Sequence, residues 1–459
     1  MHSTADAEPT TSPQLSQSLQ ARHISMISIG GMIGAGLFVG SSAAIAATGP
    51  AIVLSFLLAG GLIVFVMRML AEMAVTLPGI RSFTEFTRAG LGDGAGFVVG
   101  WLYWYFWIIV VPVEAIAGAA IIHDWLPQFE PWVIGVTLMA VMTVVNLMSA
   151  KSYGEFEFWF ASIKVAAILV FIVLAASFVL GYTSPAGPTW ANLTAHGGFM
   201  PYGVKSVLAG VITVFFSLTG AEITMIAAAE SAQPSRAVAQ MGNAVIARIL
   251  VFYVASIFLI VAAVPWTEVQ SGHSPFALVL AQMNFGWVEL AMKIVILTAV
   301  LSCLNSAFYV CSRVMFMLAA HRDAPQSLVT LNARGVPVRS VMLGTLAGML
   351  GIYAQQVSPT RVFAFLVNAS GALIVFIYIA IALSQIRLRS QRERTGGIAP
   401  PILMWGFPWL SYAVIGALLA VLVAMARTEA HAEEFWISLL TLGGVIGAYL
   451  VVSRLREPR

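Results

Sequence analysis

The sequence contains few charged residues. Only 9% of its 459 residues are Asp, Glu, Lys or Arg, whereas 59% are hydrophobic. Soluble domains carry about 25% charged residues, and several apolar runs here exceed the roughly 20 residues that cross a bilayer as a helix. This composition excludes a water-soluble globular protein. We therefore expect an all-α polytopic protein whose surroundings include membrane lipid.

Cysteines and catalytic motifs are also scarce. The two cysteines, Cys303 and Cys311, lie in one apolar segment, which excludes a disulfide framework. The sequence has no GxxxxGK[ST], HExxH or GxSxG motif, so neither ATP hydrolysis nor a familiar catalytic centre is indicated. We expect no enzyme activity, no cofactor, no metal site and no nucleic-acid partner. Any active transport would then have to use an ion gradient.

Twelve apolar segments are candidate membrane spans. They cover residues 24–47, 51–76, 95–121, 132–149, 157–181, 205–230, 242–264, 287–318, 338–356, 360–385, 405–426 and 435–453. Lys and Arg gather in every second connection between them. These basic residues include Arg81, Arg88, Lys151, Arg236, Arg322, Arg334, Arg339, Arg387 and Arg389. By the positive-inside rule, we expect both termini in the cytoplasm.

The first apolar segment contains the glycine-rich stretch "SIGGMIGAGLFVG" at residues 28–40. Its glycines weaken a helix, and their spacing of four also fits close helix packing. The sixth segment has a similar interruption at "SLTGAE". Five spans separate the two interruptions, so the halves that contain them would have opposite orientations. Paired broken helices in inverted repeats are typical of secondary transporters with a site near the membrane midplane.

This repeat gives the expected organisation of the chain. Residues 1–21 are polar and form a disordered cytoplasmic tail. The first inverted repeat covers residues 22–181 and the second covers residues 204–385. Residues 386–459 hold the last two spans and the cytoplasmic C-terminus.

The two breaks also predict the chemistry of a ligand. A broken helix leaves amide and carbonyl groups without partners, which hydrocarbon does not tolerate. The N-terminus of a half-helix attracts a carboxylate, and freed carbonyls accept from an ammonium. These preferences together indicate a zwitterion, such as an amino acid.

Glu222 lies inside the second break, near the middle of its span. A carboxylate at that depth is costly and is a functional hypothesis by default. It could contact the substrate amine or carry a proton. The alternative is a hydrogen-bonded side chain that only joins the two half-helices.

Lys164 lies about 10 Å into the fifth span from its cytoplasmic end. A lysine at this depth could snorkel towards the membrane surface. Alternatively, a buried amine could alternate between charged and neutral forms, so that a proton replaces a bound sodium ion.

Other polar and aromatic residues in the spans leave more than one reading open. Glu114 could line the outer pathway or serve packing. Arg68 and Glu72 are four residues apart, and we expect them to pair with each other. The aromatic run at 101–107 is typical of lipid-facing or core positions, although one ring could form a wall of the site.

Several long motifs resemble one family. The segments "TGPAIVLSFLLAGGLIVFVMRMLAEMAVTLP" (48–78), "KSYGEFEFWFASIKV" (151–165) and "LSCLNSAFYVCSRVMFMLA" (301–319) are similar to bacterial amino-acid permeases of the amino acid–polyamine–organocation superfamily. Within that family, "GAEITMIAAAES" (220–231) and "GWLYWYFW" (100–107) resemble the γ-aminobutyrate (GABA) permeases. The resemblance covers nearly everything after residue 20.

The resemblance implies a leucine-transporter type of fold, with two inverted sets of five helices and two further helices. It also implies a bacterial inner (plasma) membrane location. The first break would bind the substrate carboxylate through amides near Ala35 and Gly36, with the Met32 carbonyl near the amine. Phe216 would be an aromatic gate, and Glu222 and Lys164 would serve proton coupling. The full set of implied substrate-binding residues is Met32, Gly34, Ala35, Gly36, Phe216, Ser217, Thr219 and Glu222.

These observations together predict a proton-coupled importer of GABA or a similar ω-amino acid that works by alternating access. One alternative is a permease of the same family for proline, an aromatic or a basic amino acid. Another is an amino-acid channel or receptor. Gly36 stands where the GABA permeases carry serine, and we expect the missing side chain to widen the pocket.

Overall fold

The computed structural model describes residues 26, 30–77, 82–148, 150–223, 246, 248–283, 286–358 and 361–456. Within these ranges, every regular element is a helix. The α-helices are α2 (Ser41–Thr48), α3 (Ile52–Thr76), α4 (Phe83–Leu91), α5 (Asp93–Trp125), α6 (Pro131–Asn146), α7 (Ala150–Val179), α8 (Gly203–Leu218), α12 (Ser256–Ala263), α13 (Pro275–Gln282), α14 (Gly286–Ala320), α15 (Val338–Val357), α16 (Val362–Arg394), α17 (Trp409–Arg427) and α18 (Glu429–Arg456). The π-helices are η1 (Gly36–Gly40) and η4 (Ile249–Ala255), and the 3₁₀ turns are η2 (Gly49–Ala51), η3 (Trp190–Leu193), η5 (Trp266–Glu268) and η6 (Gln326–Val329).

Seven stretches of the described residues are long and apolar enough to cross a membrane. They are Gly36–Thr76, Asp93–Trp125, Tyr153–Val179, Leu290–Ala320, Phe365–Arg394, Trp409–Arg427 and Ala432–Arg454. Shorter apolar helices occupy Pro131–Asn146, Gly203–Leu218 and Ile249–Ala263. The expectation of an all-helical, multi-pass membrane protein is therefore confirmed. The expected tail at 1–21, the part of the sixth expected span at 224–230, Arg81 and Arg236 lie outside the described residues.

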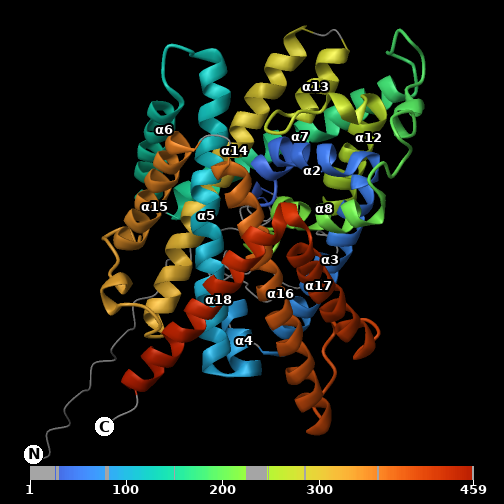
Figure 1. Cartoon of the computed structure of the whole chain (residues 1–459). Coiled ribbons are helices and arrows are strands. Elements are labelled where there is room, and N and C mark those ends of the chain that lie inside the picture. Colours follow the sequence, from blue (N-terminus) through green and yellow to red (C-terminus); the bar gives the residue numbers. More distant parts are fainter. Residues whose placement is uncertain are drawn as a thin grey trace, which may run out of the picture.

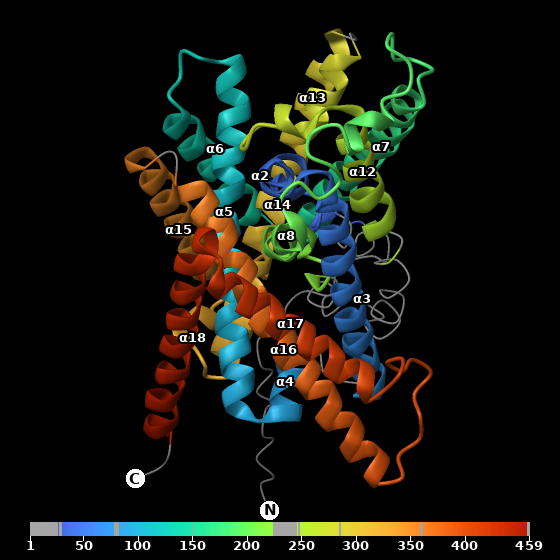
Figure 2. The same cartoon turned by 45° about the vertical axis from the view of Figure 1, so that its right-hand side comes forward.

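Both expected helix interruptions are present. Residues 31–34 form turns and bends before η1 begins at Gly36. Helix α8 ends at Leu218, and the next residue, Thr219, has an extended backbone. Figures 1 and 2 show α2 and α8 side by side in the centre of the molecule. The two interruptions therefore meet inside the bundle.

Long helices surround this centre. Helix α5 runs the height of the molecule and packs against α14, α15 and α16, as Figure 2 shows. Helix α3 packs along α8 on the other side. In Figure 1 α4 and the far end of α16 lie at the bottom of the molecule, whereas α13 and the α5–α6 connection lie at the top. We call these two ends the lower and upper sides.

The expected pair of Arg68 and Glu72 is not what the structure shows, because the two side chains have different partners. Glu72 is buried where α3 meets α16, and its carboxylate lies 3.5 Å from Arg389 and 3.4 Å from Arg392. Arg68 instead donates to the Leu403 carbonyl at 2.9 Å. Instead of pairing with each other within α3, Arg68 and Glu72 contact residues that are distant in sequence.

Gly371 sets the distance between α16 and α8. A Cβ atom at Gly371 would lie 2.8 Å from the Ile212 carbonyl oxygen, which belongs to the α8 backbone and cannot move alone. We expect Gly371→Ala to lower the free energy of unfolding by about 1–3 kcal/mol, the usual cost of overpacking. The measurement is thermal unfolding of the detergent-purified protein.

Gly61 of α3 provides the matched control, because a Cβ atom there would meet nothing within 4 Å. Gly61→Ala should leave the melting temperature unchanged or raise it, since alanine is favoured over glycine in a helix by about 1 kcal/mol. Equal melting temperatures for the two variants would contradict the packing argument.

Candidate substrate-binding site

The carbonyl groups of the first break have side-chain partners from other helices. The Lys164 Nζ of α7 donates to the Gly30 and Ile33 carbonyls, at 2.7 and 2.9 Å. The Tyr253 hydroxyl of η4 donates to the Met32 carbonyl at 2.7 Å. Hydrocarbon offers no such donors, so these side chains allow the chain to leave the helical path here. The side chain of Lys164 is 0% exposed, which places it in the core rather than at the membrane surface.

An acidic side chain holds the amide end of the same break. The Ala35 N–H donates to both carboxylate oxygens of Glu114 of α5, at 3.1 Å each. The sequence left the role of Glu114 open between pathway and packing, and the structure places it against the first break. This is also the amide expected to bind a substrate carboxylate. A substrate carboxylate could reach it only after the Glu114 carboxylate moves aside.

The two breaks are in direct contact. The Ser217 hydroxyl, at the end of α8, donates to the Gly36 carbonyl at 2.7 Å. Gly220 has φ +119°, and a Cβ atom there would lie 2.5 Å from the Gly31 carbonyl oxygen. Both the backbone angle and the close approach require glycine at position 220.

A small cavity of about 10 Å³ lies between the breaks, α5 and α14. Five of the expected substrate-binding residues line it: Met32, Gly34, Gly36, Phe216 and Thr219. Its volume is close to that of one water-sized probe. An amino acid can therefore occupy this space only when the surrounding side chains move apart.

The aromatic run at 101–107 contributes side chains to the wall of the small cavity. Phe106 and Trp107 line the small cavity, whereas Tyr105 is 36% exposed. The buried Trp107 Nε1 has no hydrogen-bond partner among the described residues.

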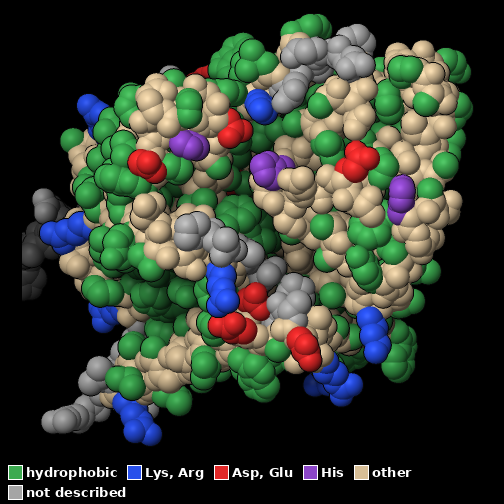
Figure 3. Space-filling view, turned by 45° about the horizontal axis from the view of Figure 1, so that its top comes forward, with side chains coloured by type: hydrophobic (Ala, Val, Ile, Leu, Met, Phe, Trp, Pro, Cys, Tyr) green, Lys and Arg blue, Asp and Glu red, His purple; other side chains and the backbone are tan. Residues whose placement is uncertain are grey.

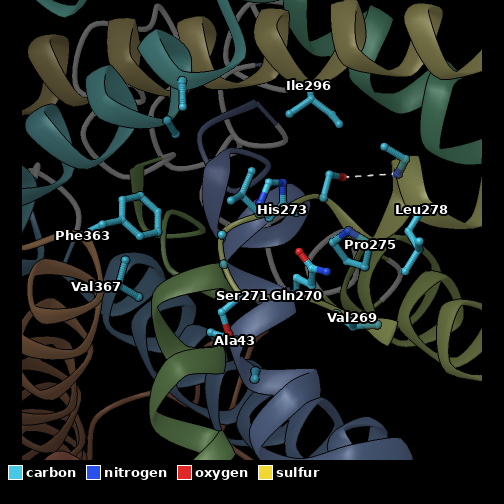
Figure 4. A pocket seen from close by; sticks show the side chains of 18 of the residues that line it. Ala43, Val269, Gln270, Ser271, His273, Pro275, Leu278, Ile296, Phe363 and Val367 are labelled. Atoms are coloured by element: carbon cyan, nitrogen blue, oxygen red, sulfur yellow. Dashed lines mark hydrogen bonds between the residues drawn. The ribbon is translucent and has the colours of Figure 1, made fainter. Parts of the chain in front are cut away.

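A much larger cavity of about 900 Å³ opens on the upper side. Figure 3 shows this hollow with hydrophobic side chains inside it and charged and histidine side chains around its rim. In Figure 4, His273 and Gln270 from the connection before α13 project into it, opposite Phe363 and Val367 of α16. The large cavity reaches Gly40 of η1, and the small one touches Gly36 of the same π-helix. The large and small cavities are thus separated by the side chains packed around η1.

Glu222 lies apart from the small cavity. Its carboxylate accepts a hydrogen bond from the Gly220 N–H at 3.2 Å and from the hydroxyls of Tyr103 and Tyr378, each at 3.4 Å. It is buried and does not line the small cavity. The structure therefore brings Glu222 to the second break but not to the same wall as Phe216.

The sequence did not identify several residues that hold the breaks. Tyr253 and Tyr378 lie in helices far apart in sequence, and a single tyrosine in an apolar run carries no signal of its own. Tyr103 belongs to the aromatic run at 101–107, but that run did not indicate its hydrogen bond to Glu222. Glu157 is buried beside Lys164. It could have been found, because it precedes Lys164 by seven residues and so lies on nearly the same face of a helix.

The expectation that Gly36 widens the pocket is wrong. A Cβ atom at Gly36 would lie 2.8 Å from Ser217 Cα and 3.1 Å from the Phe216 ring, so the space in the direction of a side chain is occupied by the end of α8. We expect Gly36→Ser to push the end of α8 away and to reduce uptake roughly tenfold, as an overpacking cost of about 1–3 kcal/mol implies.

Gly40→Ser is the matched control in the same π-helix, because the nearest atom to a Cβ there is the Ala35 carbonyl oxygen at 3.6 Å. Initial rates of labelled substrate uptake, normalised to protein amount, compare the two variants. A Gly36→Ser protein as active as Gly40→Ser would contradict the close contact of the breaks.

Comparison with known proteins identifies the family. The amino acid permease family model matches residues 23–454. The chain is 43% identical over 441 residues to the gamma-aminobutyric acid permease of Bacillus subtilis, covering 96% of this chain and 94% of the relative. It is 44% identical over 453 residues to the probable GABA permease of Pseudomonas aeruginosa (97% and 94%), and 42% identical over 446 residues to the gamma-aminobutyric acid permease of Escherichia coli (97% and 96%). The chain therefore belongs to the amino acid permease family of the amino acid–polyamine–organocation superfamily.

Proposed function

We propose that the protein is a proton-coupled importer of γ-aminobutyrate or a similar ω-amino acid. The observation that carries this proposal is the name and similarity of the relatives, which are GABA permeases at 42–44% identity over nearly the whole chain. The geometry supports it, because two adjoining helix breaks offer donors for a carboxylate and acceptors for an ammonium. The protein is a transporter and not an enzyme in this proposal.

The proposed architecture has twelve membrane-spanning helices. Residues 22–181 and 204–385 form two inverted repeats of five helices, and residues 386–459 add two helices and the C-terminus. Residues 1–21 are a cytoplasmic tail. Arg322 and Arg334 lie between α14 and α15, and Arg339 lies in the first turn of α15. The bias of basic residues towards this side supports cytoplasmic termini in a bacterial inner membrane.

The substrate would bind between the breaks. Its carboxylate would replace that of Glu114 at the Ala35 amide and would also accept from the Gly36 amide. Met32 would offer a carbonyl to the amine. Gly34, Ser217 and Thr219 would complete the wall, and Phe216 would close over the substrate. Because GABA separates its charges by three carbons, its ammonium would extend towards Glu222, whereas an α-amino acid would keep both charges at the first break.

The proton would act at Lys164 and Glu222. Lys164 binds two carbonyls of the first break, so its charge state acts directly on the segment that holds the substrate. The Glu222 carboxylate accepts a hydrogen bond from the Gly220 N–H of the second break. Alternating access would follow when the upper cavity closes and a path opens from the lower side.

Competition uptake tests the substrate. Unlabelled GABA and β-alanine should displace labelled GABA from cells that express the protein, because both carry an ammonium beyond the reach of an α-amino acid. Proline, tryptophan and lysine should compete at least about tenfold less well, a difference of about 1.4 kcal/mol in binding. Displacement by proline or an aromatic amino acid but not by GABA would instead support a different permease of this family.

Lys164→Ala tests the coupling. In proteoliposomes with an imposed pH gradient, the wild-type protein should accumulate labelled GABA, and Lys164→Ala should abolish accumulation because no proton can be exchanged at the first break. Replacing sodium with potassium should change nothing. Sodium-dependent uptake would contradict proton coupling, and a wild-type protein that only equilibrates the substrate would be a channel.

A further inference from the structure

Glu157 is a buried carboxylate that the substrate site does not use. It lies on α7 two helical turns before Lys164. Both side chains are 0% exposed, and the Lys164 Nζ lies 3.8 Å from Glu157 Oε1. A Cβ atom at Gly30 would lie 1.9 Å from the same oxygen. The carboxylate therefore lies against the first break as well as beside the lysine.

The two oxygens of this carboxylate have different surroundings. Oε1 accepts a hydrogen bond of 2.6 Å from the Ser302 hydroxyl of α14. Oε2 is buried and takes part in no hydrogen bond of good geometry in the part of the chain that the structure describes. The Ser306 hydroxyl, which pairs with Tyr153, also interacts with this carboxylate. Buried polar atoms are nearly always hydrogen-bonded, so an exception points to a role outside static packing. Oε2 is an open acceptor position for a proton.

Lys164 can lose a proton without losing its backbone contacts. A lysine ammonium has three N–H groups, and the described bonds to the Gly30 and Ile33 carbonyls use two of them. A neutral amine keeps two N–H groups, which are enough for both carbonyls. The third proton of the Lys164 ammonium is therefore the one that can leave. The Glu157 carboxylate, 3.8 Å from the Nζ, is the anionic group on α7 that can accept it.

Other titratable groups face this pair, and each already has a partner. Both oxygens of Glu114 accept from the Ala35 N–H. The Tyr153 hydroxyl pairs with Ser306 at 3.1 Å. The Cys303 thiol is directed at the Gly31 carbonyl at 4.0 Å. Glu157 differs from these groups in lying 3.8 Å from the Lys164 Nζ and in having an oxygen that takes part in no hydrogen bond of good geometry.

We propose that Glu157 is the proton acceptor of Lys164 and relays the coupled proton towards the lower side. An N–H bond of the Lys164 ammonium breaks, its electron pair stays on nitrogen, and the proton forms an O–H bond with the Glu157 carboxylate. The products are a neutral amine and a neutral carboxylic acid, and no other reactant is needed. This inference rests on the proposed proton coupling and names the partner of its lysine.

The position of Glu157 along α7 gives the relay a direction. Seven residues correspond to about 10 Å along a helix, so Glu157 lies that much nearer than Lys164 to the start of α7 at Ala150. The proposed orientation places this start at the cytoplasm. A proton that passes from Lys164 to Glu157 therefore moves inward.

Two transport assays on the full-length protein test the relay. Glu157→Gln, Glu157→Asp and wild type are reconstituted into proteoliposomes, together with Glu155→Gln, which removes a partly exposed carboxylate on another face of α7. The first assay is accumulation of labelled GABA under a pH gradient of one unit, which supports about tenfold accumulation if one proton accompanies each substrate. The second is exchange of labelled for unlabelled GABA, which needs alternation but no net proton release.

We expect Glu157→Gln to keep exchange within about twofold of wild type and to lose the whole tenfold accumulation. Glu157→Asp should recover part of the accumulation, and Glu155→Gln should behave as wild type. Full accumulation by Glu157→Gln would overturn the relay alone. Loss of exchange together with a lowered melting temperature in both Glu157 variants would assign Glu157 to folding and also overturn it. If wild type itself accumulates nothing under the gradient, the proposed function fails, and the relay fails with it.

Discussion

The need to satisfy backbone hydrogen bonds inside a membrane is the constraint on which this structure depends. The first break exposes carbonyl and amide groups in a region where lipid offers no partner. Side chains from separate helices provide the partners: Lys164 from α7, Tyr253 from η4, Ser217 from α8 and Glu114 from α5. Leaving one buried group unpaired costs about 1–3 kcal/mol. The position of the break and the packing of these helices therefore depend on each other.

This constraint also explains why the site is compact. The same contacts that satisfy the backbone bring α8 against η1, so that Gly36 and Gly220 have no room for a side chain. In the proposed site, a substrate would take over some of these hydrogen bonds. Replacing one partner with another keeps the backbone satisfied throughout, whereas simple opening of the break would not.

The sequence predicted the location of the breaks but not the partners that stabilise them. Clustered glycines and an intramembrane glutamate are local signals, and the helix ends at Leu218 and around residues 31–34 agree with them. Lys164 was identified from its position inside an apolar run, and its side chain is buried. The position of a residue along its helix, however, does not tell which neighbouring helix its side chain faces. Glu114, Glu72 and Tyr253 find partners on helices that are remote in sequence, and only the packed structure reveals which helix each of them faces.

The upper cavity has an electrical consequence. It reaches down to Gly40, so solvent and its ions can bring the potential of the upper side close to the centre of the protein. In the proposed membrane orientation, the voltage would fall mainly across the packed region around Gly36, Lys164 and Glu157. Moving one elementary charge through the full voltage is worth about 2.3 kcal/mol per 100 mV. In the proposed relay, a short proton transfer within this region would use a larger share of the membrane potential than its length suggests.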